Sequence, residues 1–349
     1  MKTDAGAPTE VLPEVAGALR PPVHGKRVGA FASYLVTVFM LLTLNFFLPR
    51  VMPGDPINAM LVSASSGGGT PVADASTRAS LQRYYGLDRP LPEQYAHYLG
   101  GLFTGDLGRS IKFNQPVWEL IGSRLPWTIL LGGASILVAL ALGVPAGISA
   151  GWRRGSRFDK ASIGFFTAVA NFPPFFVASV ALYFFAVKLG WVPLAGATTP
   201  FAEFGPVRAF FDVLHHLALP AVILGLEVAA GQFLLMRAGM VSEMGADYLL
   251  LGRAKGLTQR RLKYRYAARN ALLPTVSLTA VMLSFAVAGT IFVERVFAYP
   301  GLGRLAFEAA AYRDYPLMQG TFLILSLAVV TFNLAADLAL TRLDPRATR

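Results

Sequence analysis

WTILLGGASILVALALGVPAGISA, residues 127–150, runs for 24 positions without a charged side chain. An α-helix rises about 1.5 Å per residue and the hydrocarbon core of a bilayer is about 30 Å thick, so about 20 apolar residues are enough to cross it. The segment is therefore long and apolar enough for a membrane-spanning helix, and it sets the class of the whole protein.

Five further stretches have comparable length and apolarity. They are 28–49, 162–187, 217–240, 272–293 and 316–336. Over the 349 residues, 54% of side chains are hydrophobic and 15% charged, against about 45–50% and about 25% in soluble domains. We therefore predict an all-α integral membrane protein with six transmembrane helices. Pro173 and Pro174 predict a kink or break in the third of them, because each removes a backbone donor.

The positions of Lys and Arg predict the orientation. With the N-terminus inside, the inner segments hold 19 basic residues in 78 positions and the outer segments hold 12 in 128. Basic residues concentrate on the cytoplasmic side, so both termini are expected there. This gives a disordered cytoplasmic lead (1–27), a six-helix transmembrane domain (28–345) with an outer loop (50–125) and an inner loop (241–271), and a cytoplasmic tail (346–349).

Several classes of chemistry find no support in the sequence. It contains no Cys, and no HExxH motif or facing pair of carboxylates occurs. We assign no catalytic residue and no metal ligand. The net charge of +11 follows the inner segments, so it does not indicate nucleic-acid binding. No GxxxxGK[ST] loop is present, so the chain is not expected to hydrolyse ATP by itself.

The two polar loops carry local patterns of their own. In the outer loop, apolar spacing predicts short amphipathic helices over 91–102 and 117–125, and Gly67, Gly68 and Gly69 indicate a flexible linker. In the inner loop, we predict one short helix that starts near Asp247 and ends at Gly256, then a second one toward Asn270. A solvated positive-inside loop is the alternative interpretation of this basic stretch.

The inner loop resembles a known family. Residues 247–261, DYLLLGRAKGLTQRR, and 269–274, RNALLP, are similar to the loop of dipeptide and oligopeptide permease subunits of ABC importers that docks into an ATPase. Further motifs of that family follow in matching order over about residues 28–345. They are MPGDP (52–56), GLDRPLPEQY (86–95), GDLGRS (105–110), RLPWT (124–128), HLALPA (216–221), YPGLGRL (299–305) and RDYPLMQG (313–320). The triplet Leu250, Leu251 and Gly252 departs from the polar or small triplet common there.

The resemblance implies the type I ABC importer permease fold in a bacterial inner membrane. It implies a second permease subunit, usually a paralogue, two ATPase subunits that use ATP and Mg²⁺, an extracytoplasmic binding protein and a peptide substrate. Nickel chelates, glutathione, sugars and peptide antibiotics are substrates of some relatives, so the substrate stays open. The resemblance also implies the ATPase-coupling residues. These are Asp247, Tyr248, Leu251, Arg253, Ala254, Lys255, Gly256, Leu257 and Arg260.

Polar residues inside the spans are candidates for lining a pathway, since an intramembrane ionisable group usually faces the bundle interior or water. Glu227 is the acidic residue near the middle of the fourth span, and Asn171 and Gln232 are weaker candidates. A hydrogen bond between helices is the alternative role for all three. Glu227 also motivates a second functional class, an ion-coupled secondary transporter, which leaves the structured basic loop unexplained.

Overall fold

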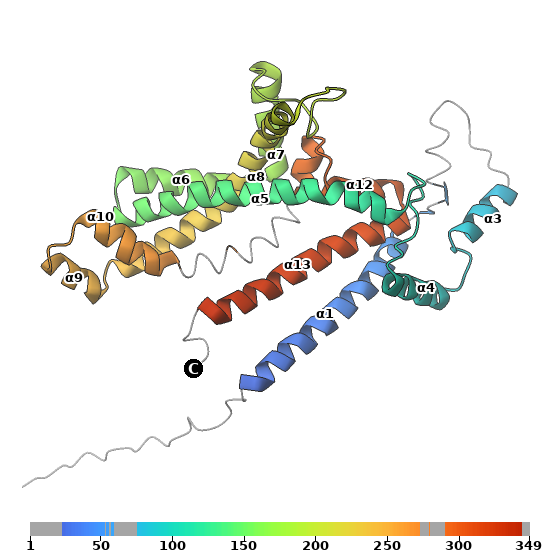
Figure 1. The fold of residues 1–349 in the computed structure, drawn as a ribbon, viewed down its shortest axis with the longest axis horizontal. Helices are drawn as coiled ribbons and strands as arrows, with labels where there is room; N and C mark the ends of the chain where they lie inside the picture. The colour runs from blue at the N-terminus through green and yellow to red at the C-terminus, as the bar shows by residue number, and fades with distance from the viewer. Residues whose placement is uncertain are drawn as a thin grey trace, which may run out of the picture.

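The computed structural model describes residues 23–52, 54, 55, 57, 58, 75–272, 279 and 290–343, with side chains between 32 and 334. Figure 1 shows a helical molecule. Within the described residues, four helices are long and apolar enough to cross a membrane. These are α1 (Val23–Val51), α5 (Val117–Trp152), α8 (Pro206–Glu243) and α13 (Tyr315–Leu343). They match four of the predicted spans. Most of the predicted span 272–293, the glycine linker and the tail 346–349 lie outside the described residues, as do residues 1–22 of the lead.

Two boundaries differ from the predictions. Helix α1 begins at Val23, so residues 23–27 are helical rather than part of a disordered lead. Residues 117–125 form no separate short helix, because α5 starts at Val117 and continues past Pro126 into the span. The predicted helix over 91–102 is confirmed as α4 (Leu91–Thr104), which follows α3 (Ala75–Tyr84).

The predicted break in the third span is confirmed. Helices α6 (Arg157–Asn171) and α7 (Pro174–Leu182), the latter continued by the π-helix η1 (Tyr183–Lys188), meet at an angle of 100°. Phe172 is extended, with ψ 135°, as expected for a residue before proline. Pro174 is the first residue of α7, where a missing N–H costs no helical hydrogen bond. If the bent pair is one span, the described residues contain up to five.

Glycines hold α5 and α8 together. A Cβ atom at Gly143 would lie 2.6 Å from the Ala229 carbonyl oxygen, and one at Gly147 would lie 2.8 Å from that of Phe233. Gly151 continues the four-residue spacing, with Met240 Cβ 2.5 Å from its would-be Cβ. Small residues at this spacing let two helix backbones approach closely where lipid leaves no hydrophobic drive for association. The two helices therefore form one tightly packed unit.

Two buried carboxylates, Glu294 and Asp314, hold together the end of the molecule opposite α9 (Asp247–Ala254). Glu294 accepts hydrogen bonds from Thr128 Oγ1 (2.8 Å) and from the Arg304 N–H (2.8 Å) at the start of α12 (Leu302–Tyr312), while Thr128 Oγ1 accepts the Leu302 N–H at 2.7 Å. Asp314 accepts from Ser110 Oγ and caps α13 through the Leu317 N–H. Carboxylates at helix N-termini satisfy otherwise unpaired donors.

Replacing Thr128 by Val is expected to destabilise this end of the fold. Valine keeps the shape but removes the Thr128 hydrogen bond to the Glu294 carboxylate, which keeps the Arg304 N–H, and leaves the Leu302 N–H without its acceptor, which costs about 2 kcal/mol. Ser135→Ala is the matched control, because the buried Ser135 hydroxyl bonds only to the Leu131 carbonyl of its own helix. Unfolding in detergent, followed by tryptophan fluorescence, measures the difference. Equal stability of the two variants would contradict this role.

Candidate functional site

The inner loop forms a short helix with a defined end. After α8 ends at Glu243, the chain forms α9 (Asp247–Ala254), which confirms the predicted helix. Gly256 has a φ of +73°, the Gly256 N–H bonds to Arg253 O at 2.9 Å and the Leu257 N–H bonds to Gly252 O at 3.0 Å. This pair of bonds around a left-handed glycine is the Schellman motif. The glycine therefore fixes both the end of α9 and the direction in which the chain leaves it.

Helix α9 is anchored to the bundle through its apolar side. Leu249 is buried against Met240 of α8 and against Leu262 of η2 (Leu262–Ala267), which follows α10 (Gln259–Arg261). A Cβ at Gly252 would lie 2.6 Å from Leu262 Cδ2. At Gly252, the last residue of the triplet Leu250, Leu251 and Gly252, α9 therefore lies close to η2.

Polar contacts tie the loop to α8 and α5. The Tyr248 hydroxyl donates to Glu243 of α8, which also accepts from Asn270 Nδ2 at 3.4 Å. Burial and this hydrogen bond raise the pKa of Tyr248 to about 12, so the phenol stays a donor at physiological pH. Lys263 Nζ donates to Ser149 Oγ of α5 at 3.1 Å. The loop is therefore joined by polar contacts to both long helices.

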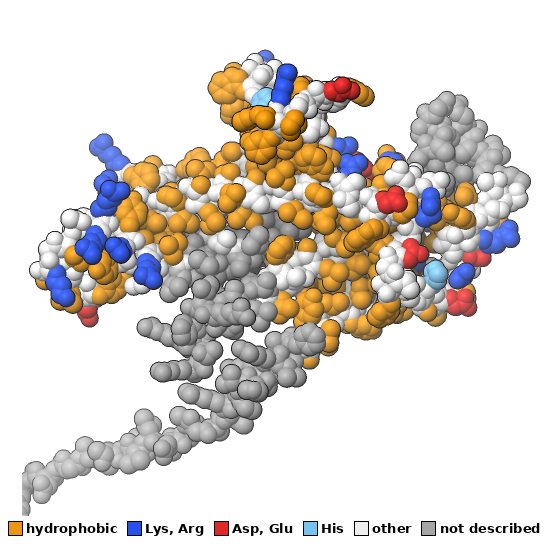
Figure 2. All heavy atoms as spheres, viewed as in Figure 1, with side chains coloured by type: hydrophobic (Ala, Val, Ile, Leu, Met, Phe, Trp, Pro, Cys, Tyr) orange, Lys and Arg blue, Asp and Glu red, His pale blue; other side chains and the backbone are white. Residues whose placement is uncertain are grey.

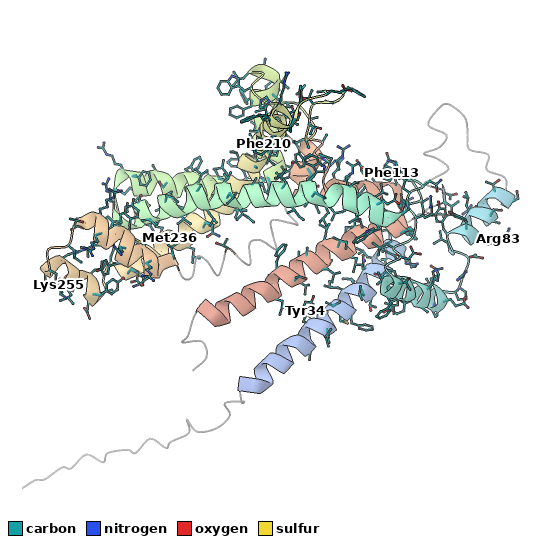
Figure 3. The ribbon with its side chains drawn as sticks, viewed as in Figure 1. Tyr34, Arg83, Phe113, Phe210, Met236 and Lys255 are labelled. Atoms are coloured by element: carbon teal, nitrogen blue, oxygen red, sulfur yellow. The ribbon has the colours of Figure 1, made fainter. Side chains whose placement is uncertain are left out.

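The outward side of α9 is apolar and basic. Leu250 is 68% exposed and Leu251 is 55% exposed. Lys and Arg side chains gather at this end of the molecule in Figure 2, and Lys255 lies at the tip of the molecule in Figure 3. Seven of the predicted coupling residues are exposed. These are Asp247, Leu251, Arg253, Ala254, Lys255, Gly256 and Arg260. Tyr248 and Leu257 are partly buried instead and pack toward the bundle, because they lie on the anchored side of the loop.

The three candidate pathway residues do not form one cluster. Gln232 is fully buried beside the α5 contact, and its Nε2 donates to Thr279 Oγ1 at 3.1 Å, as the interhelical alternative predicts. Asn171 is exposed at the α6–α7 bend and donates to Thr167 O of its own helix at 2.7 Å. Glu227 is partly buried, and no hydrogen bond or ion pair joins it to another residue of the described part of the chain.

A buried ion pair near the loop was missed in the sequence. Asp159 is 2% exposed, and Arg237 of α8 donates to its two oxygens at 2.5 and 2.9 Å, while the Gly155 N–H donates at 2.8 Å. Arg237 lies inside the predicted span 217–240, where a basic residue calls for a partner. The Gly143, Gly147 and Gly151 spacing is a second signal that was available and not used.

Comparisons with known proteins agree with this geometry. Residues 143–349 match the family described as "Binding-protein-dependent transport system inner membrane component", and residues 27–132 match the N-terminal part of such membrane components. The chain belongs to the binding-protein-dependent permease family. The permease is therefore a multi-pass inner membrane protein, and its resemblance to peptide permease subunits of ABC importers is confirmed.

Relatives with assigned names cover nearly the whole permease. The dipeptide transport system permease protein DppB of Escherichia coli K12 is 33% identical over 338 residues, covering 92% of this chain and 97% of DppB. The oligopeptide transport system permease protein AppB of Bacillus subtilis 168 is 34% identical over 305 residues, covering 87% and 92%. The inward-facing MetNI methionine ABC transporter aligns with a TM-score of 0.52 at 15% identity, over 64% of this chain and 96% of that one. This last likeness supports the type I permease fold.

Proposed function

We propose that the permease couples peptide import to ATP hydrolysis in partner subunits, with α9 as the contact element. The observation that carries this proposal is an exposed apolar pair, Leu250 and Leu251, on a helix rigidly anchored to α8. An exposed pair of leucines ringed by basic side chains suits a protein contact with an apolar centre and a charged rim. Two ATPase subunits, using ATP and Mg²⁺, supply the hydrolysis, because the chain itself has no phosphate-binding loop motif.

The rigid connections explain how coupling works. When the ATPase subunits close, they move α9 as a solid body, since its C-terminal end is fixed by Gly256 and its inner side by Leu249. Helix α8 follows through Met240 and Tyr248, and α5 follows α8 through the glycine contacts. Small shifts at packed interfaces are passed on as rigid-body motion because such interfaces deform little. The pore between this subunit and its counterpart then changes which side it opens to.

The remaining partners rest on the family. The names of DppB and AppB give a dipeptide and an oligopeptide system, so we propose a peptide as the substrate. An extracytoplasmic binding protein delivers it, and a second permease subunit, a paralogue, completes the pore. Family membership does not support the ion-coupled secondary transporter that Glu227 suggested, and lining of the pathway remains the proposed role of Glu227.

Aspartates at Leu250 and Leu251 are expected to abolish ATPase recruitment and peptide uptake together. Both side chains are exposed, so the double variant leaves the bundle intact while placing two charges in the proposed apolar contact. Val207→Asp is the control, because Val207 is 71% exposed in the first turn of α8 at the other end of the helix. Co-purification of the ATPase subunits and uptake in the same membranes are measured. Normal recruitment by the double variant would exclude α9 as the contact.

Cysteine labelling tests the proposed orientation. The protein has no Cys, so single cysteines give an unambiguous signal. A cysteine replacing Thr258, exposed in the inner loop, is expected to resist a membrane-impermeant maleimide on intact cells, while one replacing Thr104, exposed at the end of α4, reacts. Permeabilised cells, in which both positions react, are the control. Labelling of the Thr258 position from outside would reverse the topology.

A further inference from the structure

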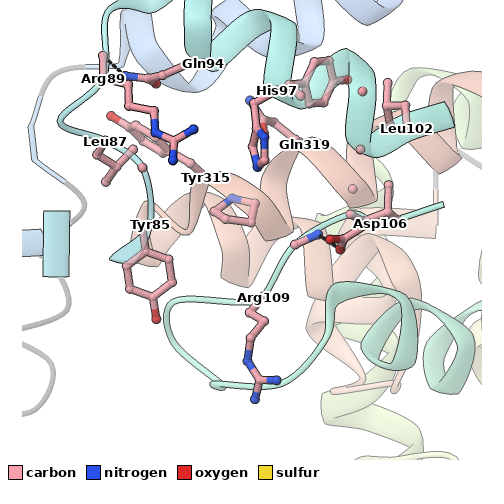
Figure 4. A pocket seen from close by; sticks show the side chains of 18 of the residues that line it. Tyr85, Leu87, Arg89, Gln94, His97, Leu102, Asp106, Arg109, Tyr315 and Gln319 are labelled. Carbon is pink, nitrogen blue, oxygen red and sulfur yellow. Dashed lines mark hydrogen bonds between the residues drawn. The ribbon is translucent and has the colours of Figure 1, made fainter. Parts of the chain in front are cut away.

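A cavity of about 730 Å³ lies at the end of the molecule opposite the α9 loop, among α3, α4, the 105–111 loop and the start of α13. Four arginines line it, against a single carboxylate. They are Arg50, Arg83, Arg89 and Arg109, with Asp106 as the carboxylate. Figure 4 shows Arg89, His97 and Gln319 among the lining side chains. The lining is therefore rich in hydrogen-bond donors and positive charge.

The groups of the cavity differ in how far they are already engaged. Arg50 bonds to Gln94 Oε1 and the Phe46 carbonyl, and Arg109 bonds to the Asn114 carbonyl. The Asp106 carboxylate accepts the Gly108 N–H at 2.8 Å. Within the described residues, the guanidinium of Arg89 makes no hydrogen bond or ion pair. The cavity therefore keeps a free cation after its internal contacts are counted.

Gln319 adds a second, independent sign of a missing partner. Its Nε2 atom is buried and has no hydrogen-bond acceptor among the described residues. A buried donor without an acceptor is destabilising, and native proteins rarely leave one. Because the free groups here are donors and cations, the ligand that satisfies them is an acceptor with negative charge, and a carboxylate fits a guanidinium best.

We propose that this cavity receives a carboxylate side chain of the extracytoplasmic binding protein and so helps to dock it. The inference rests on the proposed function, which supplies that partner. The cavity lies across the membrane-spanning bundle from the α9 loop, hence on the side where a binding protein arrives, and the exposed side chains of Arg83 and Arg89 are among those that line it. Complementary charge at such a rim raises association rate and fixes orientation.

The test measures affinity of the assembled transporter for its binding protein. The complex is placed in nanodiscs of phosphatidylcholine, which exclude a contribution from anionic lipid, and biolayer interferometry uses the binding protein that supports its peptide uptake. Arg89→Glu is expected to weaken binding about tenfold and to reduce its salt dependence. Gln319→Glu, which places a negative charge in the cavity at nearly constant volume, weakens it as well. Lys188→Glu, an equal charge change at the end of η1 outside the cavity, is the control. Its affinity for the binding protein is expected to stay within about twofold of the wild-type value.

The outcomes separate this proposal from the proposed function. Wild-type uptake together with unchanged affinity of the Arg89→Glu and Gln319→Glu complexes overturns docking at the cavity and leaves the importer assignment intact. A wild-type complex that binds no binding protein and takes up no peptide overturns both. Free glutarate serves as a small-carboxylate probe. Glutarate binding that requires Arg89, with unchanged affinity for the binding protein, makes the cavity a small-molecule site and overturns docking.

Discussion

The substitution Gly256→Val is expected to reduce peptide uptake more than tenfold while the protein still inserts into the membrane. The φ of +73° at this position disfavours any residue with a Cβ, by about 1–2 kcal/mol, and a β-branched side chain more strongly. The Schellman bonds at Gly256 and Leu257 are then lost, α9 ends elsewhere, and its exposed leucines lose the direction that the proposed ATPase contact needs.

Gly245→Val provides the control for this prediction. Gly245 lies in the same loop and is exposed, its φ is not positive, and a Cβ there would meet nothing within 4 Å. ATPase co-purification and uptake are measured for both variants at matched membrane levels. If Gly256→Val recruits the ATPase and transports normally, the fixed end of α9 has no part in coupling. If Gly245→Val is equally harmful, any change in the loop is disruptive.

Gly147→Leu is expected to prevent correct assembly of the bundle, with a loss of about 3 kcal/mol or more in stability. A Cβ at position 147 would lie 2.8 Å from both Met236 Cβ and the Phe233 carbonyl oxygen of α8. The backbones of α5 and α8 would have to move apart to make room for a leucine. Gly133→Leu is the matched control on the same helix, because Gly133 is exposed and no atom lies within 4 Å of its would-be Cβ.

Size-exclusion profiles in mild detergent and resistance to SDS unfolding measure the effect. The Gly133 variant is expected to behave as the native protein. A Gly147→Leu variant with native yield and unfolding resistance would show that α5 and α8 repack easily, and the rigid transmission from α9 to α5 would lose its basis.

Local patterns predicted the elements of this fold well. Residues 127–150 and 217–240 were identified as spans because length and apolarity alone decide whether a helix can cross a bilayer. The end of α9 was predicted at Gly256 because left-handed termini strongly favour glycine. The bend at Pro173 and Pro174 follows from proline chemistry, which needs no tertiary information.

Contacts between residues far apart in the sequence could not be predicted from local patterns. Asp159 and Arg237 are 78 positions apart, and nothing local indicates that they meet. Tyr248 was named among the ATPase-coupling residues, yet it packs toward the bundle because Glu243 and Asn270 lie on that side. Residues 117–125 were predicted as a separate helix and are instead the first turns of α5. The start of a helix depends on what its first turns pack against, which the local sequence does not show. The lining of the cavity around Gln319 comes from α3, α4, the 105–111 loop and the start of α13, so the cavity becomes visible only in three dimensions.

The Asp159–Arg237 pair also bears on the order of events during synthesis. A ribosome adds about 5–20 residues per second, so the 78 positions between the partners separate their emergence by roughly 4–16 s. During that interval the carboxylate lacks the Arg237 partner that it has in the folded protein, and burying it without that partner is unfavourable. Helix α6 therefore closes onto α8 only after α8 has emerged, and a chain truncated before Arg237 leaves the first half of the bundle open.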